Sequence, residues 1–100
     1  MEEAIKALKE RSKDIIEHYG LPHQKRKLAE EMFELIEAIT QNQCNPCKKT
    51  HDHVIEEIAD NLVLLMQMAL YYHAKDSEIL MIMAQKIART KIRMSNDGNQ

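Results

Sequence analysis

The sequence predicts an all-α fold, an antiparallel four-helix bundle that we expect to be oligomeric. Two glycines, two prolines and four aromatic residues are too few for a β fold, which needs many turns and many aromatic or β-branched side chains. Residue types that favour helices (Ala, Leu, Met, Glu, Lys and Gln) dominate, and apolar residues recur at helical spacing in four segments. The 100 residues have room for one domain, predicted over residues 1–94, followed by a disordered tail over residues 95–100.

The first two predicted helices are separated by a short break. The first is expected from about Glu2 to Tyr19, where apolar residues follow a helical period, and Gly20 and Pro22 end it. The second is expected from about Gln24 to Thr40, and it also carries an apolar stripe at helical spacing.

A polar stretch over residues 41–52 (QNQCNPCKKTHD) is predicted to be the one substantial loop. The third helix is expected from about Asp52 to His73 and the fourth from about Ser77 to Met94. From Leu62 onward the third helix is apolar on nearly every side, so we expect it to be the most buried. Two helices this apolar in so small a domain indicate a homo-oligomer, a dimer or a tetramer.

Charge and targeting signals exclude several classes of partner. Fourteen basic and sixteen acidic side chains give a net charge of −2, so we expect no nucleic-acid polymer as partner. The N-terminal segment has no apolar signal region, and the longest apolar run, Leu62 to Met66, is far too short to span a membrane. We therefore expect a cytoplasmic protein with no membrane partner and with two reduced cysteines.

Two helices carry acidic pairs with the same spacing. Glu31 and Glu34 are three residues apart on the second helix, and Glu57 and Asp60 repeat that spacing on the third. The second pair lies on the same helical stripe as the apolar Leu64, so it continues a buried face instead of a solvated one. We therefore expect these carboxylates to point into the bundle.

Carboxylates that point into a bundle need a compensating cation. Two pairs that converge from facing helices make an oxygen-rich site, which suits a hard cation such as Mg²⁺ or Mn²⁺. The sequence contains no Glu-x-x-His, the motif that a di-iron bundle requires. The alternative interpretation is that all these acids are solvated surface residues paired with lysines.

The segments KLAEEMFELIEAI (residues 27–39) and EEIADNLVLLMQMA (residues 56–69) resemble the signature of the MazG-like, all-α nucleoside triphosphate pyrophosphohydrolases. That signature is E-E-x-x-E, a gap of one to three dozen residues, and then E-x-x-D. The residues that match it are Glu30, Glu31, Glu34, Glu57 and Asp60. The resemblance covers roughly residues 20 to 70 and is weaker in the first and fourth helices.

The resemblance implies an enzyme that cleaves a nucleoside or deoxynucleoside triphosphate between its α- and β-phosphates, releasing a monophosphate and pyrophosphate. In that family the carboxylates that match Glu31, Glu34, Glu57 and Asp60 hold Mg²⁺. The family also binds phosphates through basic residues late in the chain. The residues similar in placement here are Lys86, Arg89, Lys91 and Arg93.

Hydrolysis of a phosphoanhydride also needs an oriented water and contacts to the rest of the substrate. Glu30 and Glu34 are both candidates for the catalytic carboxylate that orients or deprotonates the water, and the sequence does not choose between them. Gln24 and Lys27, just before the acidic segment, and Asn61, adjacent to Asp60, are candidate substrate-binding residues.

Two other functions remain open at this stage. A non-catalytic helical interaction module would keep the same fold and use its acids for solubility or subunit pairing. A phosphoribosyl-ATP pyrophosphatase would share the carboxylate pattern, but those enzymes usually carry an aromatic–His pair soon after E-x-x-D, where this chain has NLVLL. Cys44 and Cys47, followed by His51 and His53, have the atom types of a zinc site but a tight spacing, so we expect an ordinary polar loop.

Overall fold

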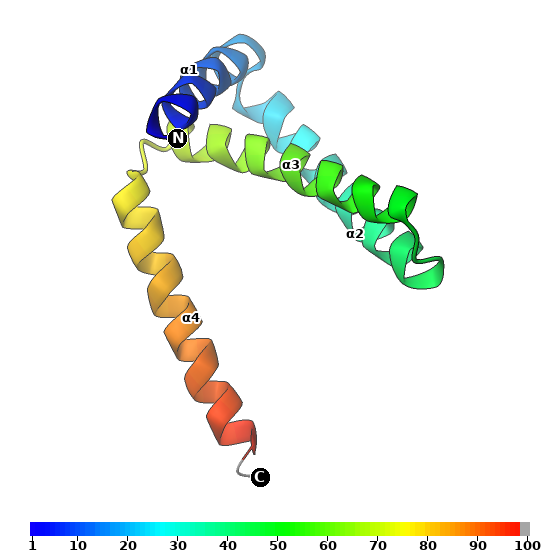
Figure 1. Cartoon of the computed structure of the whole chain (residues 1–100). Coiled ribbons are helices and arrows are strands. Elements are labelled where there is room, and N and C mark those ends of the chain that lie inside the picture. The colour runs from blue at the N-terminus through cyan, green and yellow to red at the C-terminus, as the bar shows by residue number, and fades with distance from the viewer. Residues whose placement is uncertain (99–100) are drawn as a thin grey trace.

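The computed structural model describes residues 1–98, and these residues form four α-helices and no strand (Figure 1). The helices are α1 (Glu2–Tyr19), α2 (Leu21–Cys44), α3 (Lys48–Tyr71) and α4 (Asp76–Gly98). The predicted all-α class is therefore confirmed. Residues 95–98, which were assigned to a disordered tail, continue α4, and residues 99–100 of that tail lie outside the described residues.

The break between α1 and α2 is a single residue. Gly20 has φ 83°, a left-handed conformation that glycine adopts without a Cβ clash, and its N–H donates to the Ile16 carbonyl at 2.8 Å. Pro22 lies in the first turn of α2, where its missing N–H costs nothing. The predicted break is confirmed, but Pro22 begins the second helix instead of following the first.

The turn between α2 and α3 is much shorter than the predicted loop over residues 41–52. Only residues 45–47 are non-helical, because side chains at the turn satisfy the N-terminus of α3. The Cys47 N–H donates to the Thr50 hydroxyl oxygen at 3.2 Å, and the Cys47 sulfur accepts from the backbone N–H of Thr50. These two reciprocal bonds form a capping box. This cap lets α3 begin four residues before the expected Asp52 and extends α2 to Cys44.

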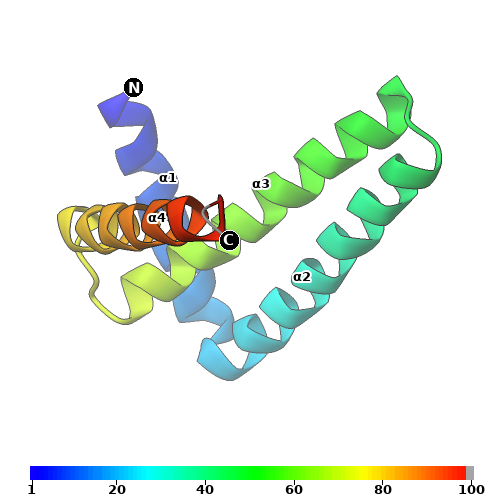
Figure 2. The ribbon, with the colours of Figure 1, turned by 90° about the horizontal axis from the view of Figure 1, so that it is seen from below.

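Three of the helices pack together. α2 and α3 form a long antiparallel hairpin, and α1 packs mainly across the C-terminal half of α3 (Figure 2). The buried apolar residues in the described chain are Ile16, Ala38 and Leu64, and six polar residues are buried beside them. The core of this protein is thus thin and unusually polar.

α4 stands apart from the other three helices of its own chain. It leaves the other three helices at the end of α3, packs against none of them within residues 1–98, and has no buried residue (Figure 1). The packed unit of a single chain is a three-helix arrangement with a projecting fourth helix. Local spacing predicted the helix, but it carries no information about where a helix packs.

The shape leaves a large surface exposed. The accessible surface is 8311 Å², whereas a compact protein of this mass exposes about 5,900 Å². The radius of gyration is 16.8 Å, against about 13 Å for a compact chain of this length. No helix in the described part of the chain is long and apolar enough to cross a membrane.

Candidate functional site

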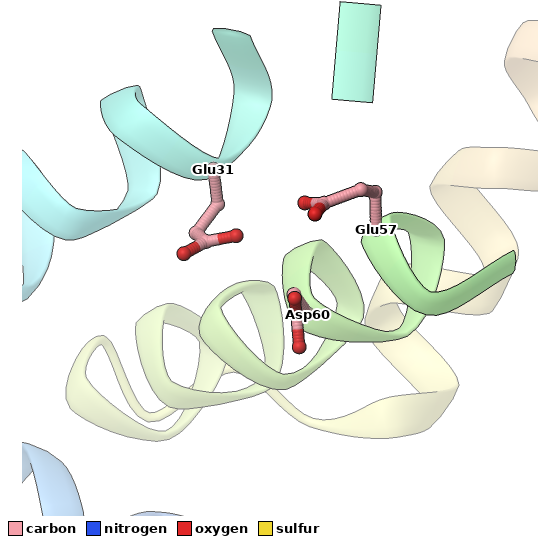
Figure 3. A group of neighbouring side chains, drawn as sticks. All are labelled: Glu31, Glu57 and Asp60. Carbon is pink, nitrogen blue, oxygen red and sulfur yellow. The ribbon is translucent and has the colours of Figure 1, made fainter. Parts of the chain in front are cut away.

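Three carboxylates meet across the α2–α3 hairpin. Glu31 comes from α2, and Glu57 and Asp60 come one turn apart from α3 (Figure 3). One oxygen of each lies within 4.8 Å of the others. Glu31 and Glu57 are each 7% exposed, whereas Asp60 opens to solvent. The convergence that the spacing of the acidic pairs predicts is therefore observed for these three residues.

Two oxygens of this cluster are buried without a partner. Glu31 Oε2 and Glu57 Oε2 are inaccessible and accept no hydrogen bond. A buried, unpartnered carboxylate oxygen costs free energy unless a cation or a donor reaches it. The donor set is all oxygen and carries several negative charges, which is the chemistry that a hard divalent cation prefers. The residues present therefore fit a bound metal ion.

The charges in the site perturb one another. Burial raises the pKa of Glu57 above its usual value, and the charges of Glu31, Glu34 and Asp60 raise it further. The charge of Glu31 is also the main cause that raises the pKa of Glu34. Lys27 Nζ lies 3.3 Å from Glu31 Oε1, and its hydrogen bond to Glu31 raises the pKa of the lysine. The cluster keeps a negative excess that one lysine does not neutralise.

Asn61 holds the two acidic helices together at this level. Its buried Nδ2 donates to the Glu31 carbonyl at 3.0 Å and to the Glu57 carbonyl at 2.8 Å. The first bond joins α3 to the backbone of α2, and the second lies within α3. The side-chain nitrogen of Asn61 is thus used by the fold, while its predicted contact to substrate stays a prediction.

A line of polar groups leads from the acidic cluster toward α1. Gln24 Nε2 donates to Gln67 Oε1 at 2.8 Å, and both residues are buried. His23 Nδ1 lies 2.7 Å from Gln24 Oε1, so an Nδ1–H tautomer donates there. The His23 ring stacks on Tyr19, with ring centroids 4.7 Å apart and planes inclined by 16°.

Two cavities follow this line. The inner cavity, about 390 Å³, is lined by Gln24, Lys27, Glu31, Asp60, Val63, Leu64 and Gln67. The outer cavity, about 510 Å³, is lined by Ile15, Tyr19, His23, Gln24, Arg26, Lys27 and Glu30. They share Gln24 and Lys27, so a ligand held at the carboxylates has room to extend toward the Tyr19–His23 ring pair.

Five of the predicted site residues line these two cavities, and of these Glu31 and Asp60 belong to the inner one. Gln24 and Lys27 line both, and Glu30 lines the outer one. Glu34 is not one of the three carboxylates that meet. It lies beside this group and, together with Glu57, lines a third cavity of about 200 Å³. Its assignment as a metal ligand stays a prediction.

The predicted phosphate-binding residues lie elsewhere. Lys86, Arg89, Lys91 and Arg93 are exposed on α4, which does not pack against the acidic helices of its own chain within residues 1–98. The structure of one chain therefore does not bring these cations to the carboxylates.

Sequence reasoning missed His53 as a neighbour of the site. His53 Nε2 lies 3.9 Å from Glu57 Oε1, and His53 also lines the third cavity. The signal was present in the spacing, since residues four apart on a helix are neighbours. Cys44 and Cys47 are free and exposed, and over residues 1–98 three metal-ligating groups come together only at Glu31, Glu57 and Asp60.

The comparison with known families agrees with the geometry. The family model of the MazG nucleotide pyrophosphohydrolase domain matches residues 22–93, which include the whole acidic cluster and most of α4. The chain matches no curated protein and no solved structure. The family predicted from the two acidic segments is confirmed by a match over most of the sequence. The chain therefore belongs to the MazG nucleotide pyrophosphohydrolase domain family.

Proposed function

We propose that this protein is a Mg²⁺-dependent pyrophosphohydrolase that converts nucleoside or deoxynucleoside triphosphates to the monophosphate and pyrophosphate. The observation that carries the proposal is the pair of buried, unpartnered oxygens of Glu31 and Glu57, whose side chains meet beside Asp60 (Figure 3). A purely structural hairpin gains nothing from two such groups, because each weakens the fold when no cation is bound.

Glu31, Glu57 and Asp60 would hold the metal ion, with Glu34 on their flank. When bound, Mg²⁺ neutralises phosphate charge and polarises the phosphoryl group, and Mn²⁺ is a chemically similar substitute. Among the chain's own groups, Lys27 lies beside Glu31 and lines both cavities, so it is placed to bind a phosphate oxygen.

The outer cavity suits the nucleoside part of the substrate. Its volume of about 510 Å³ is in the range of small-molecule sites, and the Tyr19–His23 ring pair offers an aromatic surface for a base. Gln24 presents its side chain between the two cavities, where it would contact the sugar or the first phosphate.

Of the two candidate catalytic carboxylates, Glu34 is the better placed. It lies beside Glu31, and the charge of Glu31 raises its pKa, which makes it a stronger base toward water. Glu30 lines the outer cavity instead. We assign Glu34 to orient and deprotonate the attacking water and Glu30 to the substrate entrance.

The direct test is pyrophosphate release from a panel of ribo- and deoxyribonucleoside triphosphates, with and without Mg²⁺. We expect Mg²⁺-dependent release of pyrophosphate, and not of phosphate, from at least one nucleotide. Phosphoribosyl-ATP in the same panel tests the related substrate class. Absence of hydrolysis for every compound, with the protein folded and Mg²⁺ present, would favour the non-catalytic helical module.

A further inference from the structure

The turn between α2 and α3 carries two thiols that the proposed activity does not use. Cys44 is the last residue of α2, and Cys47 is the N-cap residue of α3. Both cysteines are free and exposed. The turn lies at the end of the hairpin that points away from α1 and α4 (Figure 2), so a small oxidant in solution can reach both sulfurs.

One side chain folds this turn back on itself. The Thr50 hydroxyl donates to the Asn45 carbonyl at 2.9 Å and accepts from the Cys47 N–H at 3.2 Å. Contacts from one hydroxyl to the backbone on both sides of the turn keep its two ends close together. The first and last Cα atoms of a four-residue turn lie within about 7 Å, and a disulfide needs a separation of about 4.4 to 6.8 Å. The positions of Cys44 and Cys47 therefore suit a disulfide across the turn.

The surroundings of Cys47 favour the thiolate form of its side chain. Cys47 precedes a helix of 24 residues, and the free N–H groups at a helix N-terminus stabilise a negative charge. The hydrogen bond to the Thr50 hydroxyl, the bond from the Thr50 N–H and the charge of Lys49 hold the pKa of Cys47 below its usual value. The thiolate is the form that attacks an oxidant, so Cys47 is suited to be the attacking sulfur.

The neighbouring histidines do not complete a metal site with these thiols. His51 Nδ1 lies 3.5 Å from an Asp52 carboxylate oxygen, and His53 Nε2 lies 3.9 Å from Glu57. Within residues 1–98, three metal-ligating groups gather only in the acidic cluster. Two exposed thiols without further ligands leave thiol–disulfide chemistry as the chemistry of this turn.

We propose that Cys44 and Cys47 form a redox site, at which hydrogen peroxide oxidises the two thiols to a disulfide. The Cys47 thiolate attacks one peroxide oxygen, so that an S–O bond forms, the O–O bond breaks, and the hydroxide that leaves takes up a proton. The Cys44 thiol then attacks the Cys47 sulfur, an S–S bond forms, and the S–O bond breaks. The departing hydroxide takes the proton of Cys44 and leaves as water. The thiols lose two electrons and two protons, and the peroxide is reduced to two waters.

The disulfide changes the start of α3. In the reduced protein the Cys47 sulfur accepts from the Thr50 N–H, but in the disulfide this sulfur is bonded to Cys44, carries no charge and is a weak acceptor. The first turn of α3 therefore loses its cap. Cys47 lies ten residues before Glu57, about 15 Å along the helix, so the redox site does not depend on the proposed hydrolysis.

Mass spectrometry tests the disulfide. Both cysteines fall in one tryptic peptide, residues 28–48. After treatment of the folded, reduced protein with hydrogen peroxide, we expect this peptide to be lighter by two hydrogen atoms, and a dithiol should restore its mass. Glu57→Gln, which alters only the acidic cluster, should form the disulfide at the wild-type rate. Two such peptides joined to each other, or peptides that only gain oxygen, would overturn the proposal.

Serine variants assign the two roles. In Cys44→Ser the sulfenic acid of Cys47 has no second thiol to meet, so dimedone should trap it, whereas the wild type should be trapped much less. Cys47→Ser keeps a good N-cap residue, and its remaining thiol should react with peroxide about tenfold more slowly than the thiol of Cys44→Ser. Equal rates in the two variants would show that Cys47 is not the attacking sulfur.

Amide hydrogen exchange measured by NMR tests the effect on α3. The amides of residues 50–53 should exchange about twofold to thirtyfold faster in the oxidised protein than in the reduced one, which corresponds to the loss of an N-cap. The amides of residues 64–70, at the other end of the same helix, are the internal control and should not change. Cys47→Ser treated with peroxide should also show no change. Equal exchange at residues 50–53 in both forms would contradict the loss of the cap.

Discussion

Glu57 affects both the stability of the metal-free protein and its ability to bind a metal ion. It is buried, one of its oxygens has no hydrogen-bond partner, and burial together with the charge of Glu31 raises its pKa. Without a metal ion this group weakens the fold, because a charged carboxylate is held away from water among like charges. With a metal ion the same group becomes a ligand, so metal binding and stability are coupled.

Glu57→Gln should therefore abolish hydrolysis and leave the metal-free protein at least as stable as the wild type. Mg²⁺ at millimolar concentration should raise the melting temperature of the wild type by about 5 °C or more and that of the variant much less. The measurement is thermal melting of both proteins in EDTA and in Mg²⁺. Glu56→Gln, which changes an exposed neighbour, is the matched control and should behave like the wild type. A variant that melts far lower in EDTA would mean that Glu57 is a structural partner.

The raised pKa values of Glu57 and Glu34 also set the sign of a pH effect. A raised pKa means that the folded, metal-free protein binds protons more readily than the unfolded chain. Its stability should rise as the pH falls from 7 through the raised pKa values, and this gain should be lost as the pH climbs back through them. Denaturant unfolding in EDTA between pH 5 and 8 measures the effect. The slope should be shallower in Glu57→Gln, and equal slopes in the two proteins would contradict the assignment.

At the scale of single helices, residue spacing predicted which side chains meet more accurately than it predicted where the helices begin and end. The i, i+3 pairs placed Glu31, Glu57 and Asp60 on facing stripes, and the structure brings them together because helical periodicity is local. The boundaries of α2 and α3 were wrong at their shared turn, because the cap that Thr50 and Cys47 form depends on two side chains meeting in one geometry. The position of α4 could not be predicted from spacing, because the direction in which a helix packs depends on the turn at His73 and on partners outside the helix.

Asn61 ties α3 to α2, and its removal should loosen the hairpin at the acidic cluster. Asn61→Ala deletes two hydrogen bonds from a buried amide, so we expect a loss of about 1 to 3 kcal/mol in the free energy of unfolding. Asn42→Ala, which removes one bond to Thr50 at the far turn, is the control and should cost less. Denaturant unfolding without substrate gives both values. Unchanged stability with a raised KM would instead assign Asn61 to substrate binding.

For the whole molecule, the described residues enclose too little apolar surface to explain a stable monomer. The apolar stripe of α4, which consists of Leu80, Met83, Ile87 and Met94, is exposed, and so are Met32, Ile36, Ile58 and Leu62 on the side of the hairpin away from the acids. Only three apolar residues are buried in the described chain: Ile16 on α1, Ala38 on α2 and Leu64 on α3. The sequence predicted an oligomer because its helices are too apolar for the small core of one chain. It could not indicate that α4 stands apart, because a buried amphipathic helix and an unpartnered one have the same residue pattern.

Light scattering at micromolar concentration should therefore give a mass of at least twice 11.7 kDa. Ile87→Glu places a charge in the middle of the α4 stripe and should lower the mass or raise the dissociation constant by at least tenfold, since a buried charge at an interface costs more than 1.4 kcal/mol. Ile92→Glu puts the same charge on the opposite side of α4, at a residue equally exposed in one chain, and should leave the oligomer intact. Equal effects of the two substitutions would show that α4 packs through another face. A wild-type mass of 11.7 kDa at these concentrations would show that the chain tolerates its exposed apolar surface alone.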